Sequence, residues 1–184
     1  MSYRKIIHTA YLANSDRSLV LRQEFAKLML PLLASKKRII NIDESSVPFL
    51  DFRHHKWHSK AEKNSISRKD LTQKVNMIVA IDTQGKVYAA LTQVNTDSDV
   101  MVSFLSRLVT VLKAEDRDWL HNTILLTDCA KYHKSAATRK MFKQIGASFI
   151  ISSPYSYDAA PVELYFSYFK RVQVNPEHLK TGKA

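Results

Sequence analysis

The chain has few of the residues that cross-link a protein or interrupt its backbone. Its 184 residues include one cysteine, Cys129, three glycines and five prolines. A single cysteine excludes an internal disulfide and favours a reducing compartment. The low glycine and proline content argues against a disordered chain. With a hydrophobic share of 45%, a chain of this length can bury the core of one domain.

Long apolar runs are missing as well. No uninterrupted stretch reaches the roughly 20 apolar residues that a membrane-spanning helix needs. Residues 1–17 lack the apolar centre of a signal peptide. We therefore expect a protein that is neither secreted nor bound to a membrane, located in the nucleus of a eukaryote or in the cytoplasm or nucleoid of a bacterium.

Acidic residues are under-represented. The chain carries 28 Lys and Arg against 17 Asp and Glu, which gives a net charge of +11. Such a balance favours a polyanionic partner, nucleic acid before membrane. Residues 53–74 hold seven basic residues against two acids, and residues 131–143 hold five against none. Either segment alone also fits a solvated surface that keeps the protein soluble.

Hydrophobic periodicity predicts a helix ahead of the first strand. The helix is expected to begin at Asp16, which can act as its cap, and to end at Pro31 and residues 35–38. Its apolar face is predicted to hold Leu21, Phe25, Leu28 and Leu32.

The remaining pattern alternates strands with helices. We expect a strand at 39–42, a hairpin at 74–95 that turns at Asp82–Gly85, a helix after 96–99, a strand at 123–127, a helix from near Ser135 to Gly146, a strand at 148–152 and a helix that Pro161 opens. The second helix is predicted to bury Met101, Phe104, Leu105, Leu108 and Leu112. This order predicts an α/β fold in which helices cover both faces of a mixed sheet.

Three acids stand at the ends or starts of these elements. Asp43 and Asp128 each end an apolar strand, and Glu163 lies in the first turn of the last helix. If the two strands are neighbours, the three carboxylates meet at one sheet edge. Carboxylates in close proximity repel one another unless a cation intervenes, and oxygen ligands suit Mg²⁺ or Mn²⁺. A pair of such ions supports phosphoryl transfer, so these residues predict metal-assisted phosphodiester chemistry.

Each candidate also has an ordinary explanation. An Asp after a strand commonly forms a turn, and Glu163 alone is a routine capping carboxylate. Glu44 is a substitute ligand for Asp43, although it should point to the opposite face of the strand. His133 fits either a structural role or a contact with DNA or a catalytic water. The combination of three acids with basic flanks favours the metal site.

Three segments carry a family resemblance. They read NIDES at 41–45, LLTDCAKYHKS at 125–135 and PYSYDAAPVELYFSYFKR at 154–171. They resemble the catalytic blocks of mariner-type DDE transposases, including bacterial insertion-sequence relatives, in which D-E, D-N-A-x-x-H and P-Y-S-P-D-L-N-P-I-E recur. The 34 residues between Asp128 and Glu163 match an interval characteristic of that family. The resemblance covers roughly residues 17–172.

This resemblance implies an RNase H-like fold with Asp43, Asp128 and Glu163 as the catalytic, metal-binding triad. It further implies two Mg²⁺ or Mn²⁺ ions, transposon-end and target DNA as partners, and a homodimer. Water would cleave the transposon end, and the freed 3′-hydroxyl would then attack the target. Residues 1–35 would form an arm and helix leading into a catalytic domain at 36–184, without upstream helix-turn-helix domains.

Basic residues near these blocks are the predicted DNA contacts. They are, together with one histidine, Arg53, Lys56, Lys60, Lys131, His133, Lys134, Lys170 and Arg171. The last two also fit a cap at the end of the final helix. Departures from the family pattern are Cys129 in place of Asn, and Tyr157, Ala159 and Ala160 in place of Pro, Leu and Asn. Two alternatives stay open: a non-catalytic DNA-binding remnant of a transposase, and another nuclease of the RNase H fold.

Overall fold

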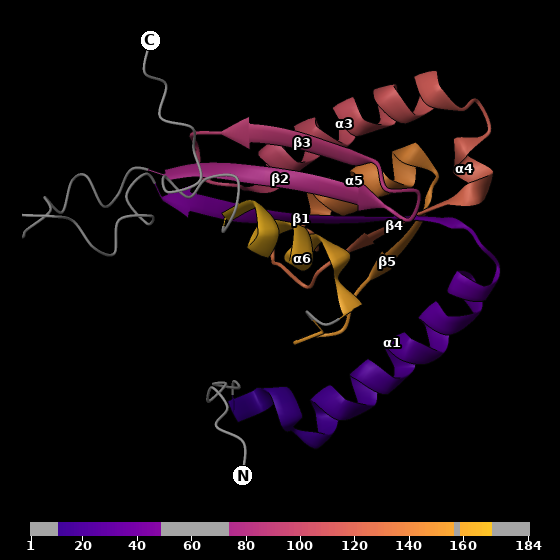
Figure 1. Ribbon diagram of the computed structural model, residues 1–184, viewed down its shortest axis with the longest axis vertical. Helices are drawn as coiled ribbons and strands as arrows, with labels where there is room; N and C mark the ends of the chain where they lie inside the picture. The colour runs from indigo at the N-terminus through magenta and orange to yellow at the C-terminus, as the bar shows by residue number, and fades with distance from the viewer. Residues whose placement is uncertain (1–10, 49–73, 157–158, 171–184) are drawn as a thin grey trace, which may run out of the picture.

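The computed structural model describes residues 11–48, 74–156 and 159–170 (Figure 1). Arg53, Lys56, Lys60 and Arg171, which we predicted to contact DNA, lie outside these ranges, as does Tyr157. Within them the elements are η1 (Tyr11–Asn14), α1 (Asp16–Ala34), β1 (Arg38–Pro48), β2 (Lys74–Asp82), β3 (Val87–Thr92), α3 (Ser98–Glu115), α4 (Trp119–Asn122), β4 (Thr123–Thr127), α5 (Ala136–Ile145), β5 (Ser148–Ile151) and α6 (Pro161–Tyr168). None of these helices is long and apolar enough to span a membrane.

A five-stranded mixed sheet forms the centre of the fold. Its order is β3-β2-β1-β4-β5. The hairpin of β2 and β3 pairs antiparallel onto β1, while β4 and β5 join on the other side as parallel strands. Because parallel neighbours need a crossover, α5 connects β4 to β5. The predicted mixed sheet is confirmed, and β1 is its central strand.

Helices cover both faces of the sheet, as predicted (Figure 1). On one face α3 and α5 pack against residues such as Ile40 and Ile42 of β1. On the other face α1 packs through Phe25 onto Ile39, and α6 packs on β2. Since successive side chains in a strand alternate between faces, even-numbered residues of β1 face α3 and α5, and odd-numbered ones face α1 and α6.

The first helix differs in detail from the prediction. Its cap is Ser15, whose Oγ accepts a hydrogen bond from the Ser18 backbone N–H, so assigning the cap to Asp16 was wrong by one residue. Pro31 lies inside the helix, which continues to Ala34. Leu28 was predicted to face inward but is 50% exposed, because α1 meets the sheet only along a narrow strip around Phe25.

The other helix boundaries follow the sequence closely. Asp97 caps α3 by accepting two backbone N–H groups, and the five apolar residues predicted to face inward from this helix are all buried. Ser135 caps α5, and Gly146 ends it in the left-handed conformation with φ of 74°. The short helix α4 was not predicted; it carries Trp119, which is 1% exposed.

An ion-pair cluster closes the end of the sheet where β1 begins. Arg38 Nη2 lies 2.6 Å from Asp82 Oδ2 and 3.2 Å from Glu115 Oε2, and its guanidinium also bonds the Tyr88 hydroxyl. The Asp82 side chain has no exposed surface. Buried charges of this kind need such partners, so the cluster fixes the hairpin turn against the start of β1.

Candidate active site

Asp43 lies within a strand and not at its end, which corrects the sequence prediction. Strand β1 continues to Pro48 because residues 43–48 pair with β2. On its other side, however, the ladder with β4 stops at the pair Ile42–Thr127. Asp43 and Asp128 are therefore each the first residue beyond that ladder. The two strands are parallel neighbours, as the prediction required, and the acids follow at the same level.

The same alternation decides which face these acids occupy. Asp43 lies four residues after Ile39 in β1, so both side chains point to the same face of the sheet. Ile39 packs toward α1, and Asp43 therefore faces the side that carries α1 and α6. Asp128 follows Leu126 by two residues and Ile124 by four, so it continues the series of side chains that face this same side. Glu163 belongs to α6, which covers this face. The fold thus brings the three predicted acids to one face of the sheet.

The helix that carries Glu163 is attached directly to β1. The side-chain Oδ1 of Asn41 accepts a hydrogen bond of 3.1 Å from the Val162 backbone N–H. Both residues are buried, while Glu163 itself, one position later, is exposed. Sequence reasoning did not identify Asn41, although an amide in the middle of an apolar run is a signal that it needs a buried partner.

The electrostatics show that the three acids affect one another. Burial, together with the charges of Asp128 and Glu163, raises the pKa of Asp43 to about 7, although the Glu44 backbone N–H and His133 act to lower it. A carboxyl in this position takes up a proton near neutral pH unless another positive charge stabilises its ionised form.

Asp128 is held in its ionised form. Its Oδ1 accepts hydrogen bonds from the Ala130 backbone N–H at 2.9 Å and from His133 Nδ1 at 2.5 Å. Burial alone would raise the pKa of Asp128, but the hydrogen bonds from His133 and Ala130 outweigh it and leave the pKa below its usual value. The side chain remains 49% exposed, so a ligand can reach it.

His133 is entirely buried, at 0% exposure. This is at odds with the predicted contact to DNA, because the ring lies in the interior and bonds Asp128 instead. Its other nitrogen, Nε2, is 3.9 Å from Glu44 Oε2. Burial first, and then the charge of Asp43, raise the pKa of Glu44 to about 7. Glu44 faces the side opposite Asp43, as the strand alternation predicted, and there approaches the His133 ring.

Three of the basic residues that were predicted to contact DNA lie in the described part of the chain, and they differ in exposure. Lys131 and Lys134 are exposed in the loop between β4 and α5, and the charge of Lys134 contributes to the lowered pKa of Asp128. Lys170 is half-buried just after α6. Lys131 and Lys134 therefore place positive charge beside the end of β4 where Asp128 lies.

The donor set fits a hard divalent cation in its chemistry. Burial and the charges of Asp128 and Glu163 raise the pKa of Asp43, and a metal ion would offset the repulsion between these carboxylates. Over residues 11–48, 74–156 and 159–170, however, no three Asp, Glu, His or Cys side chains stand close enough together to hold a metal ion. The charges of Asp128 and Glu163 are near enough to act on the pKa of Asp43, and the Glu163 side chain is exposed on α6.

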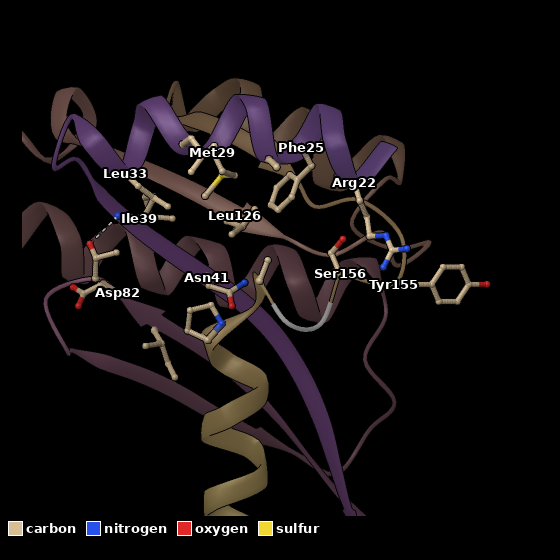
Figure 2. A pocket seen from close by; sticks show the side chains of 16 residues that line it. Arg22, Phe25, Met29, Leu33, Ile39, Asn41, Asp82, Leu126, Tyr155 and Ser156 are labelled. Carbon is tan, nitrogen blue, oxygen red and sulfur yellow. Dashed lines mark hydrogen bonds between the residues drawn. The ribbon is translucent and has the colours of Figure 1, made fainter. Parts of the chain in front are cut away.

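An apolar cavity of about 580 Å³ lies beside these acids, between α1 and the sheet (Figure 2). Phe25, Met29 and Leu33 of α1 form one wall, and Ile39 and Leu126 lie opposite. None of the three acids lines it. Asn41 does line the cavity, and its side chain is directed toward the start of α6. The three acids therefore lie outside this cavity.

Cys129, which stands where the transposase pattern that the sequence resembles has Asn, makes a local contact between two strand ends. The Cys129 thiol donates a hydrogen bond to the Ser152 carbonyl at 3.1 Å, and the Ser152 backbone N–H donates to the Thr127 carbonyl at 2.7 Å. These contacts tie the loop after β4 to the end of β5. Cys129 is thus a hydrogen-bonded residue in the loop that holds Asp128.

Comparisons with known proteins give one family and one fold. A family model described as DDE superfamily endonuclease matches residues 38–183. Among solved structures, the chain is similar to the Mos1 mariner paired-end complex with Mn (TM-score 0.72, 18% identity, 92% of this chain and 53% of that one). It is also similar to the Mos1 strand transfer complex (TM-score 0.68, 20% identity, 92% of this chain and 52% of that one). A third similar structure is the Mos1 catalytic domain with Raltegravir and Mg (TM-score 0.65, 19% identity, 85% of this chain and 73% of that one).

These findings confirm the RNase H-like fold that the three sequence blocks implied. The chain spans about half the length of the Mos1 chains in the two DNA-processing complexes. A search of curated protein sequences found no significant match.

Proposed function

The chain belongs to the DDE superfamily of endonucleases, and on that basis we propose that it is the catalytic core of a transposase. Its reaction would be metal-dependent cleavage of DNA at transposon ends, followed by transfer of the freed strand into a target. Residues 36–184 would form the catalytic domain, and the arm and helix at 1–35 would lead into it.

One observation carries this proposal. Asp43, Asp128 and Glu163 come from three separate elements, and both other charges raise the pKa of Asp43. Such repulsion lowers the stability of the folded protein, because burying a carboxyl beside two others is unfavourable, so stability does not explain this arrangement. Perturbed acids gathered on one face are typical of a functional site.

The metal would be held by these three carboxylates. Mos1 structures contain Mn or Mg, which are the ions that an all-oxygen donor set favours. Such an ion, when bound, stabilises negative charge on the phosphate and lowers the pKa of an attacking water. We propose two ions, both held by these three acids.

The chain's own residues have distinct tasks in this reaction. His133 and the Ala130 N–H occupy Oδ1 of Asp128 and so fix the carboxylate in its ionised form. Asp43, whose pKa is raised to about 7, would be ionised in the protein that holds a cation. Lys131, Lys134 and Lys170, with Arg53, Lys56, Lys60 and Arg171, would bind phosphates without reading sequence. Transposon ends and target would be the DNA partners, and a homodimer would bring two ends together.

A second candidate is a DNA-binding remnant that no longer cleaves. The observation in its favour is that, in the part of the chain that the structure covers, the acids are not gathered tightly enough to hold an ion. In this case the basic residues would still bind DNA, while the carboxylates would have no role.

Nicking of supercoiled plasmid in the presence of Mg²⁺ or Mn²⁺ tests the proposal. The wild-type chain is compared with Glu163→Gln, which keeps the shape of the side chain and removes its charge. Glu24→Gln, at an exposed position of α1, is the matched control. We expect nicking by the wild type and by Glu24→Gln and none by Glu163→Gln.

Equal nicking by all three proteins would reject Glu163 as a catalytic residue. Absence of nicking by any of them, with DNA binding retained, would favour the remnant.

A further inference from the structure

Asn41 is a polar side chain in the middle of the apolar core. It lies in β1 between Ile40 and Ile42, which have no exposed surface, and is itself 5% exposed. Burying an amide is unfavourable unless it is hydrogen-bonded. Its bond joins it to Val162, which is 121 positions away in the sequence.

The partner of Asn41 is a backbone group that α6 cannot satisfy by itself. The first N–H groups of a helix lack intrahelical acceptors and are usually bonded by a cap side chain. The cap position of α6 is Ala160, and no side chain there accepts a hydrogen bond. Pro161 follows and has no N–H to donate. Val162 carries the next N–H, and Asn41 on β1 accepts it.

This bond lies close to two of the three acids. Asn41 precedes Asp43 by two residues, so the two side chains share a face of the sheet. Val162 immediately precedes Glu163. One hydrogen bond therefore connects the strand of the first acid to the helix of the third, next to both.

Packing alone leaves the position of α6 less well defined. Val162 and Phe166 are buried against Met77 and Val79 of β2. Contacts between apolar side chains are non-directional and tolerate small shifts along the sheet. A hydrogen bond to one acceptor tolerates much less, because its strength falls steeply with distance and angle.

We propose that Asn41 is a positioning residue, which sets the place of Glu163 relative to Asp43 by capping α6 from the neighbouring strand. This inference rests on the proposed function, because it concerns the geometry of the same three acids. It assigns to a buried amide a role in metal binding without contact to the metal.

Three variants and a matched control separate this role from a purely structural one. Asn41→Leu is similar in size but cannot accept the bond, whereas Asn41→Asp keeps an acceptor oxygen in the same place. Asn76→Leu is the control, since Asn76 is 3% exposed in β2 and faces away from α6, where it bonds the Val94 carbonyl. Asn41→Ser, with a shorter side chain, replaces Asn41→Leu if that variant does not fold.

The measurements are Mn²⁺ affinity from the free-ion signal in electron paramagnetic resonance, thermal stability, and amide hydrogen exchange in α6. For Asn41→Leu we expect about a tenfold or greater loss of Mn²⁺ affinity and faster exchange at Val162. Asn41→Asp should recover most of the affinity. Asn76→Leu should lose stability to a similar degree but keep wild-type Mn²⁺ affinity.

Two outcomes would overturn the inference in different ways. If the wild type binds Mn²⁺ and Asn41→Leu binds it equally well, Asn41 is a structural residue and the proposed function stands. If the wild type itself binds no Mn²⁺, the proposed function fails and the positioning role fails with it.

Discussion

The Nδ1 atom of His133 lies 2.5 Å from Oδ1 of Asp128, and the histidine ring is completely buried. That oxygen also accepts the Ala130 N–H, so it is fully occupied within the protein. In the part of the chain that the structure describes, no hydrogen bond reaches the other oxygen, Oδ2. The pairing therefore orients one carboxylate of the predicted triad and leaves its second oxygen for a ligand.

Replacement of His133 should weaken metal binding through Asp128. His133→Leu removes the hydrogen bond and keeps the volume, whereas His133→Asn can present a donor near the position of Nδ1. We expect the leucine variant to lose about 10- to 100-fold in Mn²⁺ affinity, and the asparagine variant clearly less. Titration with Mn²⁺ followed by electron paramagnetic resonance gives both values. Identical affinities in the two variants would show that the bond does not matter for the metal.

The stability of the metal-free protein should fall as pH rises from about 4 to 7. Burial raises the pKa of both Asp43 and Glu44 to about 7. In this window the folded state binds protons that the unfolded state has already released, so the free energy of unfolding decreases with pH and levels off above about 7. The pKa of Asp128 shifts the other way, but its effect lies below this window.

Asp43→Asn isolates the contribution of the first acid. Without the carboxyl, the metal-free variant should be more stable than the wild type by a few kcal/mol near pH 8, with the difference shrinking as pH falls and vanishing below about pH 4, where Asp43 is protonated in both the folded and the unfolded state. Added Mg²⁺ should raise the melting temperature of the wild type more at pH 8 than at pH 6, because protons compete with the ion, and should not raise that of the variant. Thermal unfolding at each pH, with and without Mg²⁺, is the measurement. A variant that Mg²⁺ stabilises as much as the wild type would exclude Asp43 as a ligand.

The loop that follows β4 should contribute to DNA binding. Lys131 and Lys134 are both exposed, and Lys134 acts on the pKa of Asp128. Replacing both by Ala should weaken binding to duplex DNA of any sequence and reduce the slope of log affinity against log salt by about 2. Lys113→Ala, in the last turn of α3 and close to the opposite end of the sheet, is the control. Fluorescence anisotropy over a range of salt concentrations measures the DNA affinity of each protein. An unchanged slope of log affinity against log salt in the double variant would show that this loop does not contact DNA.

Loss of the ion pair at the start of β1 should affect stability and leave the site intact. Arg38 is paired with Asp82, whose side chain has no exposed surface, so Arg38→Met leaves a buried carboxylate without its partner. We expect a loss of about 3–5 kcal/mol in the free energy of unfolding. Arg38→Met combined with Asp82→Asn should recover part of it. Urea denaturation gives these energies, and a change below about 1 kcal/mol would mean that the backbone N–H groups of Gln84 and Lys86, which donate to Oδ1 of Asp82, are enough to stabilise the carboxylate.

Local sequence determined the elements and most of their boundaries. Ser135 and Gly146 limit α5 because a side-chain oxygen at the start and a left-handed residue at the end satisfy the backbone there. Two β-rich runs on either side of a Gly-containing turn were enough to predict the hairpin of β2 and β3. At the start of α1 several neighbouring polar residues can act as the cap, and the cap is Ser15 where Asp16 was predicted.

The candidate site was predictable in composition but not in arrangement. The three acids stood out because of their spacing and the family resemblance, and their placement as a catalytic triad stays a prediction. The contacts around those acids could not be read from the chain: Asn41 of β1 accepts the Val162 N–H across 121 positions, and Glu44 of β1 approaches His133 in the loop after β4.

By itself, the sequence determined which residues carry charge, which segments form strands and helices, and which three carboxylates belong to the motif. Only the tertiary structure decided that β1 continues past Asp43, that the ladder with β4 stops just before it, and that the amide of Asn41 caps a distant helix. The physical reason is that strand length and helix position depend on hydrogen bonds between segments remote in the chain, and no local pattern specifies which of them become neighbours.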